Sequence, residues 1–257
     1  MRTKTLLIAA SALAAAVNYS SQAQSTVYSQ NVVGYVNITV AAGKQVLAAN
    51  QLDLSGGNFS NGSNSINNCF INGPVSGKTY AYIFTGAGFK TLTYDNSSAA
   101  PGSYGPGWYG DNGNAPSTDQ LNPGNGCWLV NGAASSLTVT TVGNVLQGTN
   151  QLTVQTGQQI YSVPDPFQNL PLDNTNVNFP GVSGKSFIYA WTGSGFSTLT
   201  YDNSSAAPGS YGPGWYGPNG NVPADNYPTN WPSPGQSVWI NNGAGHTLNW
   251  NQIFTVP

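Results

Sequence analysis

The clearest pattern along the chain is an alternation of large aromatic residues with small or aliphatic ones. Residues 80–84 read YAYIF and residues 187–191 read FIYAW, so aromatic side chains occupy every second position. A period of two built from strand-favouring residues predicts β-strands. Because a face of three alternating aromatic residues is usually buried, we expect Tyr80, Tyr82, Phe84 and their counterparts to lie in the core.

Turn signals separate these strands from their neighbours. TGAG and TGSG follow the two aromatic segments and lead into FKTLTY and FSTLTY, which predicts two hairpins. Further strand candidates are GYVNITV, KQVLAAN, CWLVN and SLTVTTV, and no helical stripe occurs after the first residues of the chain. Many short strands with frequent turns predict an all-β fold of antiparallel β-sandwich or small β-barrel modules.

The chain contains an internal duplication. Residues 75–95 align without gaps to residues 182–202, NPGNGCWLV answers SPGQSVWIN, and VAAGKQVLA at 40–48 answers VQTGQQIYS at 154–162. Two repeats of this size predict two tandem domains. We place module 1 at 24–142 and module 2 at 143–257, with the boundary in VGNVLQG.

The N-terminal segment 1–23 reads as a secretory signal peptide. Arg2 and Lys4 precede an apolar run that is too short to cross a bilayer, and Ser21 and Ala23 are small residues suited to cleavage after Ala23. No later segment is apolar enough for a membrane span. We therefore expect an exported protein that is extracellular, at the cell surface or in the periplasm.

Charge excludes several classes of partner. Without the two basic residues of the signal peptide, four lysines and no arginine face eight aspartates and no glutamate. A nucleic-acid or anionic-membrane binder needs lysine and arginine to neutralise phosphates. We expect neither partner, whereas polysaccharide and other surface proteins stay open.

Two long segments carry a resemblance to a known family. YSQNVVGYVNITVAAGKQVLAANQL follows the signal peptide, and LNPGNGCWLVNGAASSLTVTTVGNVLQG comes later. Over most of the mature chain the sequence resembles uncharacterised secreted bacterial proteins built from duplicated all-β modules. The resemblance implies secretion and tandem β modules and supplies no catalytic residue.

Residues suited to catalysis are scarce. The only histidine, His246, has no counterpart in module 1, and neither a nucleophile elbow nor a zinc-type cluster occurs. Asp95 and Asp202 are equivalent aspartates in different modules, and an Asp-Asn-Ser sequence readily caps a turn. We expect no catalytic residue, metal site or cofactor, and a secreted glycoside-active enzyme is the second alternative.

Both cysteines lie in module 1. In an exported protein, Cys69 and Cys127 are candidates for a disulfide. The module 2 counterpart of Cys127 is Val238, so a buried thiol is the other interpretation. We predict the disulfide.

A block of twenty letters, TLTYDNSSAAPGSYGPGWYG, occurs unchanged at 91–110 and 198–217. Loops usually drift faster than strands. Gene conversion, a structural plug made by the Trp-Tyr pairs, and a sugar-binding aromatic platform each account for the identity. The predicted ligand-binding residues are Asp95, Asn96, Tyr104, Trp108, Tyr109, Asp202, Asn203, Tyr211, Trp215 and Tyr216.

These features predict an exported, non-catalytic β-repeat protein that is structural or adhesive outside the cell. Carbohydrate binding through the duplicated aromatic loops is the alternative, because aromatic faces beside amides and carboxylates suit the C–H faces and hydroxyls of a sugar ring.

Overall fold

The structure is a computed structural model, and it describes residues 32–59, 61–96, 105–110, 115–163, 166, 172, 177–203, 213–217 and 233–255. Within these residues nearly all regular structure is β, and the one helix, α2 (Ile66–Cys69), is a single turn. The predicted all-β fold is confirmed.

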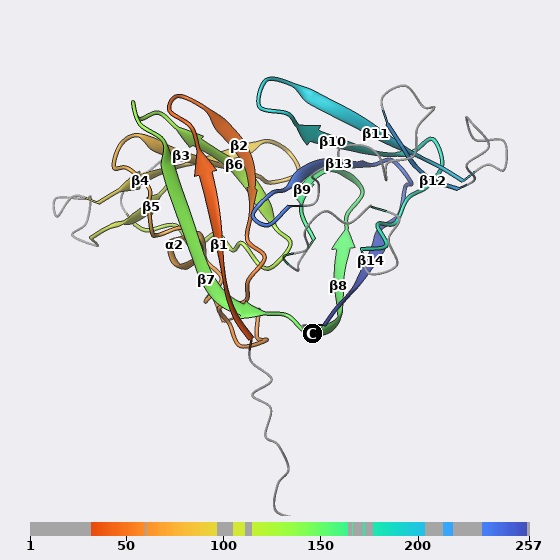
Figure 1. Cartoon of the computed structure of the whole chain (residues 1–257), viewed down its shortest axis with the longest axis horizontal. Helices are drawn as coiled ribbons and strands as arrows, with labels where there is room; N and C mark the ends of the chain where they lie inside the picture. Colours follow the sequence, from red (N-terminus) through yellow and green to blue (C-terminus); the bar gives the residue numbers. More distant parts are fainter. Residues whose placement is uncertain are drawn as a thin grey trace, which may run out of the picture. The chain divides into compact units, whose positions relative to one another are not determined.

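Module 1 consists of a two-stranded ribbon and a five-stranded sheet, both antiparallel (Figure 1). The ribbon pairs β1 (Val32–Val40) with β7 (Leu137–Val145). The order of the sheet is β2 (Gln45–Ala49), β6 (Gly126–Asn131), β3 (Thr79–Phe84), β4 (Phe89–Asp95) and β5 (Gly107–Tyr109).

Module 2 repeats this topology strand for strand. Its ribbon pairs β8 (Gly148–Val154) with β14 (Leu248–Phe254). Its sheet has the order β9 (Gly157–Tyr161), β13 (Val238–Asn242), β10 (Ser186–Trp191), β11 (Phe196–Asp202) and β12 (Gly214–Tyr216). The chain passes from one module to the next between β7 and β8, inside VGNVLQG, and contacts join both modules into one compact unit.

Each module is a sandwich whose ribbon covers one face of its sheet. Alternate strand residues point into the core between the two layers: Val36, Ile38, Val139, Ala81, Leu92 and Leu129 in module 1, and Val154, Trp250, Ile188, Leu199 and Ile240 in module 2. Neither five-stranded sheet closes on itself, because its two edge strands are not paired with each other. The sandwich, of the two predicted architectures, is the one present.

The expected burial of the aromatic strand face is wrong. Ala81 is fully buried, whereas Tyr80, Tyr82 and Phe84 are half-buried. Across the strands Ala81 lies opposite Leu92 and Leu129, and these three face the ribbon. The period of two correctly predicted a strand, but it does not say which face a second layer will cover. The aromatic side chains therefore form the outer face of the sheet.

The two modules differ by one residue of register at their first sheet strand. Leu47 of β2 pairs with Trp128, and Ile160 of β9 pairs with Trp239, the counterpart of Trp128 in the repeat. Leu47 therefore corresponds to Ile160, whereas the gap-free sequence match aligned it with Tyr161. The partner of this tryptophan comes one residue earlier after Val154 (Ile160) than after the equivalent Val40 (Leu47), and a shift of one residue exchanges the two faces of a strand relative to the sequence match.

Candidate functional site

The two modules meet through reciprocal backbone contacts. Isolated bridges join Ala48 to Gln236 and Tyr161 to Asn125. With the register above, Ala48 corresponds to Tyr161 and Asn125 corresponds to Gln236, so the two bridges are equivalent. Contacts that repeat with the partners exchanged define an interface of approximate two-fold symmetry, as in an isologous dimer.

Hydrogen bonds follow the same symmetry. The N–H of Ala49 donates to Gly235 O at 2.9 Å, and the N–H of Ser162 donates to Gly124 O at 2.8 Å. Gln51 is buried between the modules, where its Nε2 donates to Val163 O at 3.1 Å and its Oε1 accepts from Gly235 N at 2.6 Å. These polar bonds connect the modules closely.

The Pro-Gly turns of the repeat are the elements that cross the junction. Gly124 and Gly235 have φ of +90° and +80°, a conformation that favours glycine. A Cβ on Gly235 would lie 2.6 Å from Ile38 of the module 1 ribbon, and one on Gly124 would lie 3.3 Å from Leu152 of the module 2 ribbon. Each module thus inserts its turn against the ribbon of the other.

Aromatic side chains cover the junction beside these turns. Trp239 of module 2 contacts the β3–β4 hairpin of module 1, with ring centroids 4.9 Å from Phe84 and 5.6 Å from Phe89. Phe84 and Phe89 also contact each other, edge to face, at 5.3 Å. Such edge-to-face and tilted arrangements are favourable for aromatic pairs.

The reverse arrangement repeats these contacts. Trp128 of module 1 contacts the β10–β11 hairpin of module 2, with ring centroids 5.1 Å from Trp191 and 6.0 Å from Phe196. Trp191 replaces Phe84 of the other copy, and its Nε1 donates to Gln45 O at 3.1 Å. The hairpin of each module therefore packs against the tryptophan of the other module.

A pocket of about 320 Å³ lies among these side chains. It is lined by Phe89, Trp128, Tyr189, Phe196 and Trp239, so both modules contribute to it. None of the five is a charged residue, and the lining is almost entirely aromatic carbon. Phe89 and Phe196 are each 48% exposed, so the pocket is accessible to solvent. Its size and apolar lining are typical of a ligand site.

Half-buried polar and aromatic residues extend from the pocket over both sheets. Tyr82 pairs with Trp128 on one side and Thr91 on the other, and the equivalent row in module 2 is Trp239, Tyr189 and Thr198. Residues paired directly across neighbouring strands lie on the same face. Each outer face thus presents a row of a tryptophan, a tyrosine and a threonine, which lie side by side on three neighbouring strands.

The duplicated Trp-Tyr pairs do not form an open platform. Trp108 and Trp215 are 0% exposed, and their Nε1 atoms donate to Phe70 O at 2.9 Å and Phe179 O at 3.2 Å. Tyr109 and Tyr216 are also buried. Strands β5 and β12 carry these residues at the sheet edge, where the tryptophans point into the cores. The pairs are buried, as the structural-plug interpretation expects, and their rings do not form the exposed platform that the binding interpretation expects.

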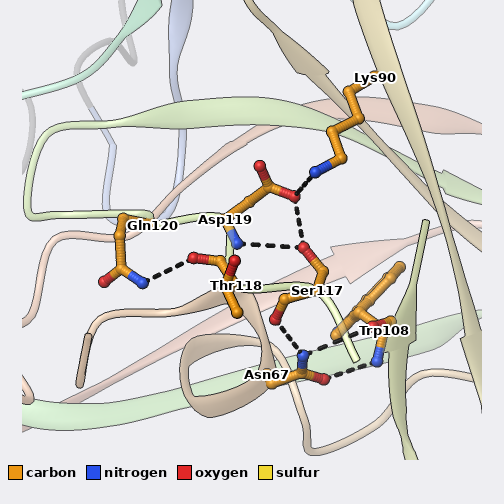
Figure 2. Close-up of polar contacts among 7 residues, drawn as sticks. All are labelled: Asn67, Lys90, Trp108, Ser117, Thr118, Asp119 and Gln120. Carbon is orange, nitrogen blue, oxygen red and sulfur yellow. Dashed lines mark hydrogen bonds and ion pairs between the residues drawn. The ribbon is translucent and has the colours of Figure 1, made fainter. Parts of the chain in front are cut away.

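Polar contacts fasten this plug in module 1 (Figure 2). Asn67 accepts from Trp108 N at 2.6 Å and donates to Ser117 O at 2.7 Å. Asp119 accepts from Ser117 Oγ and forms an ion pair with Lys90 at 2.6 Å. The contacts anchor the segment after the duplicated loop to the sheet and to α2.

The other predicted loop residues have mixed positions. Ser76 Oγ donates to Asp95 at 3.0 Å and Ser183 Oγ donates to Asp202 at 3.1 Å, so each aspartate ties a strand end to a neighbouring turn. Asn96 and Asn203 are exposed, whereas Tyr104 and Tyr211 lie outside the described residues. Ligand binding by this set stays a prediction.

Both cysteines are free thiols, not the predicted disulfide. Cys69 and Cys127 are fully buried in the module 1 core, and Cys69 Sγ donates to Asn64 O at 3.4 Å. Burial raises the pKa of each thiol, with a further contribution from Asp53 for Cys69 and from Cys69 for Cys127, to about 12. Protonated, buried thiols of this kind behave as small apolar side chains.

Asp53 is the one deeply buried carboxylate among the described residues. Burial tends to raise its pKa, but hydrogen bonds from Ser55, Asn64 and Gly57 outweigh burial and hold the pKa below its ordinary value. These partners all donate to the carboxylate, so they satisfy its charge without a cation. Asp53 thus holds the loop that contains Ser55, Gly57 and Asn64 together through its hydrogen bonds.

Among the described residues, no three histidine, cysteine or acidic side chains are placed to bind a metal ion together. In the same part of the chain, no helix has the length and apolar character needed to cross a membrane.

No protein-family model, curated protein or solved structure matches the chain. The function is therefore inferred from the geometry of the junction.

Sequence reasoning missed the junction pocket. Trp128 and Trp239 stand at the same place in the matched segments CWLV and VWIN, and Phe89 and Phe196 directly follow the hairpin turns. Repetition of large aromatic residues in both copies was the available signal. It did not indicate that the hairpin of one module packs on the tryptophan of the other.

Proposed function

We propose that this is an exported, non-catalytic protein that adheres to polysaccharide outside the cell. The binding surface is the outer face of the two sheets, centred on the junction pocket. The observation that carries the proposal is the pocket itself. Five aromatic residues from both modules line it, and two of them, Phe89 and Phe196, are exposed to solvent. Its place on the sheets differs from the duplicated loops that the sequence favoured.

The chemistry of this surface suits a sugar ring. Aromatic faces pack against the C–H faces of a pyranose, and neighbouring hydroxyls form hydrogen bonds with its polar edge. Thr91 and Thr198 place hydroxyls on the same faces as the rings. A ligand that lies partly open to solvent keeps its other hydroxyls hydrated, so a strongly apolar pocket does not leave them unsatisfied.

A non-catalytic role agrees with the placement of the carboxylates. Glycoside hydrolysis commonly uses two carboxyl groups that flank one bond. Asp95 and Asp202 end strands of different sheets, and each accepts a hydrogen bond from a serine of its own module. Export rests on the pattern of residues 1–23.

The test is a titration of the mature protein with a panel of soluble polysaccharides, followed by tryptophan fluorescence and calorimetry. We expect Phe89→Ala and Phe196→Ala each to weaken binding about tenfold, because each removes an accessible ring of the pocket. Phe59→Ala, which removes an exposed ring outside the pocket, is the matched control. Unchanged affinity in both pocket variants, or no binding by the wild type to any polymer, would refute the proposal.

A second candidate function is assembly with other surface proteins. The outer face of the β1–β7 ribbon exposes Val33, Tyr35 and Val142, and Tyr35 and Val142 are directly paired. The equivalent pair of the module 2 ribbon is Thr149 and Ile253, so a single apolar side chain, Ile253, is exposed there. Sedimentation of wild type and Tyr35→Ser over a range of concentrations tests this role, which predicts weaker association for the variant.

A further inference from the structure

We infer that the two modules form one continuous binding site for a single neutral polysaccharide chain, rather than two equivalent sites. This inference rests on the proposed function and specifies its ligand and stoichiometry. Duplicated modules ordinarily suggest two sites that gain avidity on a polymer. The geometry of the junction instead favours a single site.

The pocket does not exist within one module. Module 1 contributes Phe89 and Trp128, and module 2 contributes Tyr189, Phe196 and Trp239. Moreover, the tryptophan of each module packs on the hairpin of the other, so equivalent residues form opposite walls of one space. The repeat therefore builds a single central site out of two half-sites.

The rows on the two sheets both lead to this centre. In module 1 the row runs over three neighbouring strands from Thr91 through Tyr82 to Trp128. Neighbouring strands lie about 4.8 Å apart, which is close to the length of one pyranose residue in an extended chain. Successive sugar rings thus meet successive side chains of the row.

The module 2 row continues from the same pocket. It runs from Trp239 through Tyr189 to Thr198, and both Trp239 and Tyr189 line the pocket. Because each row ends at a tryptophan in the pocket wall, one extended chain that crosses the strands can contact both rows. Its binding would place one chain on each protein molecule.

The rows carry no charged side chain. The described lysines lie elsewhere: Lys44, Lys78 and Lys185 are exposed in turns, and Lys90 is paired with Asp119. By strand alternation, Asp95 and Asp202 share the outer faces at their far ends. Negative charge there repels a polymer of uronates or sulfated sugars, so the surface favours a neutral chain.

The experiment is calorimetric titration of the mature protein with cello- and xylo-oligosaccharides of increasing length, and with oligogalacturonides as the anionic comparison. We expect one oligosaccharide per protein, an affinity that rises until the chain spans both rows, and at least tenfold weaker binding of the anionic series. Tyr82→Ala and Tyr189→Ala should each lower the affinity of that one binding event, with the number of sites unchanged.

The outcomes separate this inference from the proposed function. Two binding events per protein, or a half-population of sites with wild-type affinity in Tyr82→Ala, would overturn the single site while polysaccharide binding stands. Equal affinity for oligogalacturonides would overturn the neutral ligand. Absence of binding to every polysaccharide overturns both proposals. The length series uses the wild type, so it decides the question even if a variant does not fold.

Discussion

Gly126 and Ser237 occupy equivalent positions in the two modules and face each other across the junction. A Cβ on Gly126 would lie 2.5 Å from Ser237 Oγ and 2.8 Å from Ile160 Cγ2. Ser237 Oγ in turn donates to Ala48 O of the other module at 2.9 Å. The space between these two positions has room for one side chain only. Module 2 therefore has a serine there, and module 1 has a glycine.

Gly126→Ser should therefore lower the unfolding free energy of the protein. Overpacking a close contact typically costs about 1–3 kcal/mol of unfolding free energy. Urea unfolding measures the loss. Gly88→Ser is the matched control, because a Cβ at Gly88 meets no atom within 4 Å and its effect should stay within about 0.5 kcal/mol. Equal stability of the two variants would contradict the close contact.

Trp108→Ala and Trp215→Ala should each strongly lower the stability of the protein. Each side chain is fully buried and hydrogen-bonded, and truncation of a buried tryptophan costs about 3–5 kcal/mol. Thermal melts of both variants should show large losses, and Phe59→Ala, at an exposed aromatic residue, should melt like the wild type. Variants that melt normally but lose sugar binding would instead favour the loops as the site.

Gln252→Met should stabilise module 2. The Gln252 amide is fully buried, and neither its Nε2 nor its Oε1 has a hydrogen-bond partner. Replacing an unsatisfied buried amide by an apolar side chain of similar size should raise the unfolding free energy by about 1–2 kcal/mol.

Thr141 provides the contrast to Gln252. It holds the corresponding place in module 1, since Leu137 and Leu248 pair with the equivalent residues Val40 and Val154. Thr141 Oγ1 donates to Cys69 O at 2.9 Å, so Thr141→Val should lower stability by about 1–3 kcal/mol. Shifts of the same sign in both variants would contradict the assignment of satisfied and unsatisfied groups.

The two cysteines should be unreactive in the folded protein. Because burial raises the pKa of Cys69 and Cys127 to about 12, almost no thiolate is present near pH 8, and both side chains are inaccessible. Ellman's reagent should detect no thiol in the native protein at that pH and two thiols per chain in denaturant. Absence of thiols in denaturant would restore the disulfide that the sequence predicts.

Local pattern and repetition in the sequence determined the strands, the hairpins and the two-module plan. YAYIF and FIYAW predicted β3 and β10, and the matched segments predicted equivalent modules, because strand alternation and turn chemistry are local properties of the chain. Repetition also marked Trp108 and Trp215 as special, although it did not distinguish a buried plug from a binding platform.

Tertiary structure alone decided which face of each strand is buried and where the modules touch. Ala81 points into the core because a ribbon covers that side of the sheet, and this leaves Tyr82 and Phe84 outside. A one-residue difference in the pairing register of β2 and β9 then sets which of their residues meet the junction. The pocket between Trp128 and Trp239 depends on that long-range packing, which no local pattern specifies.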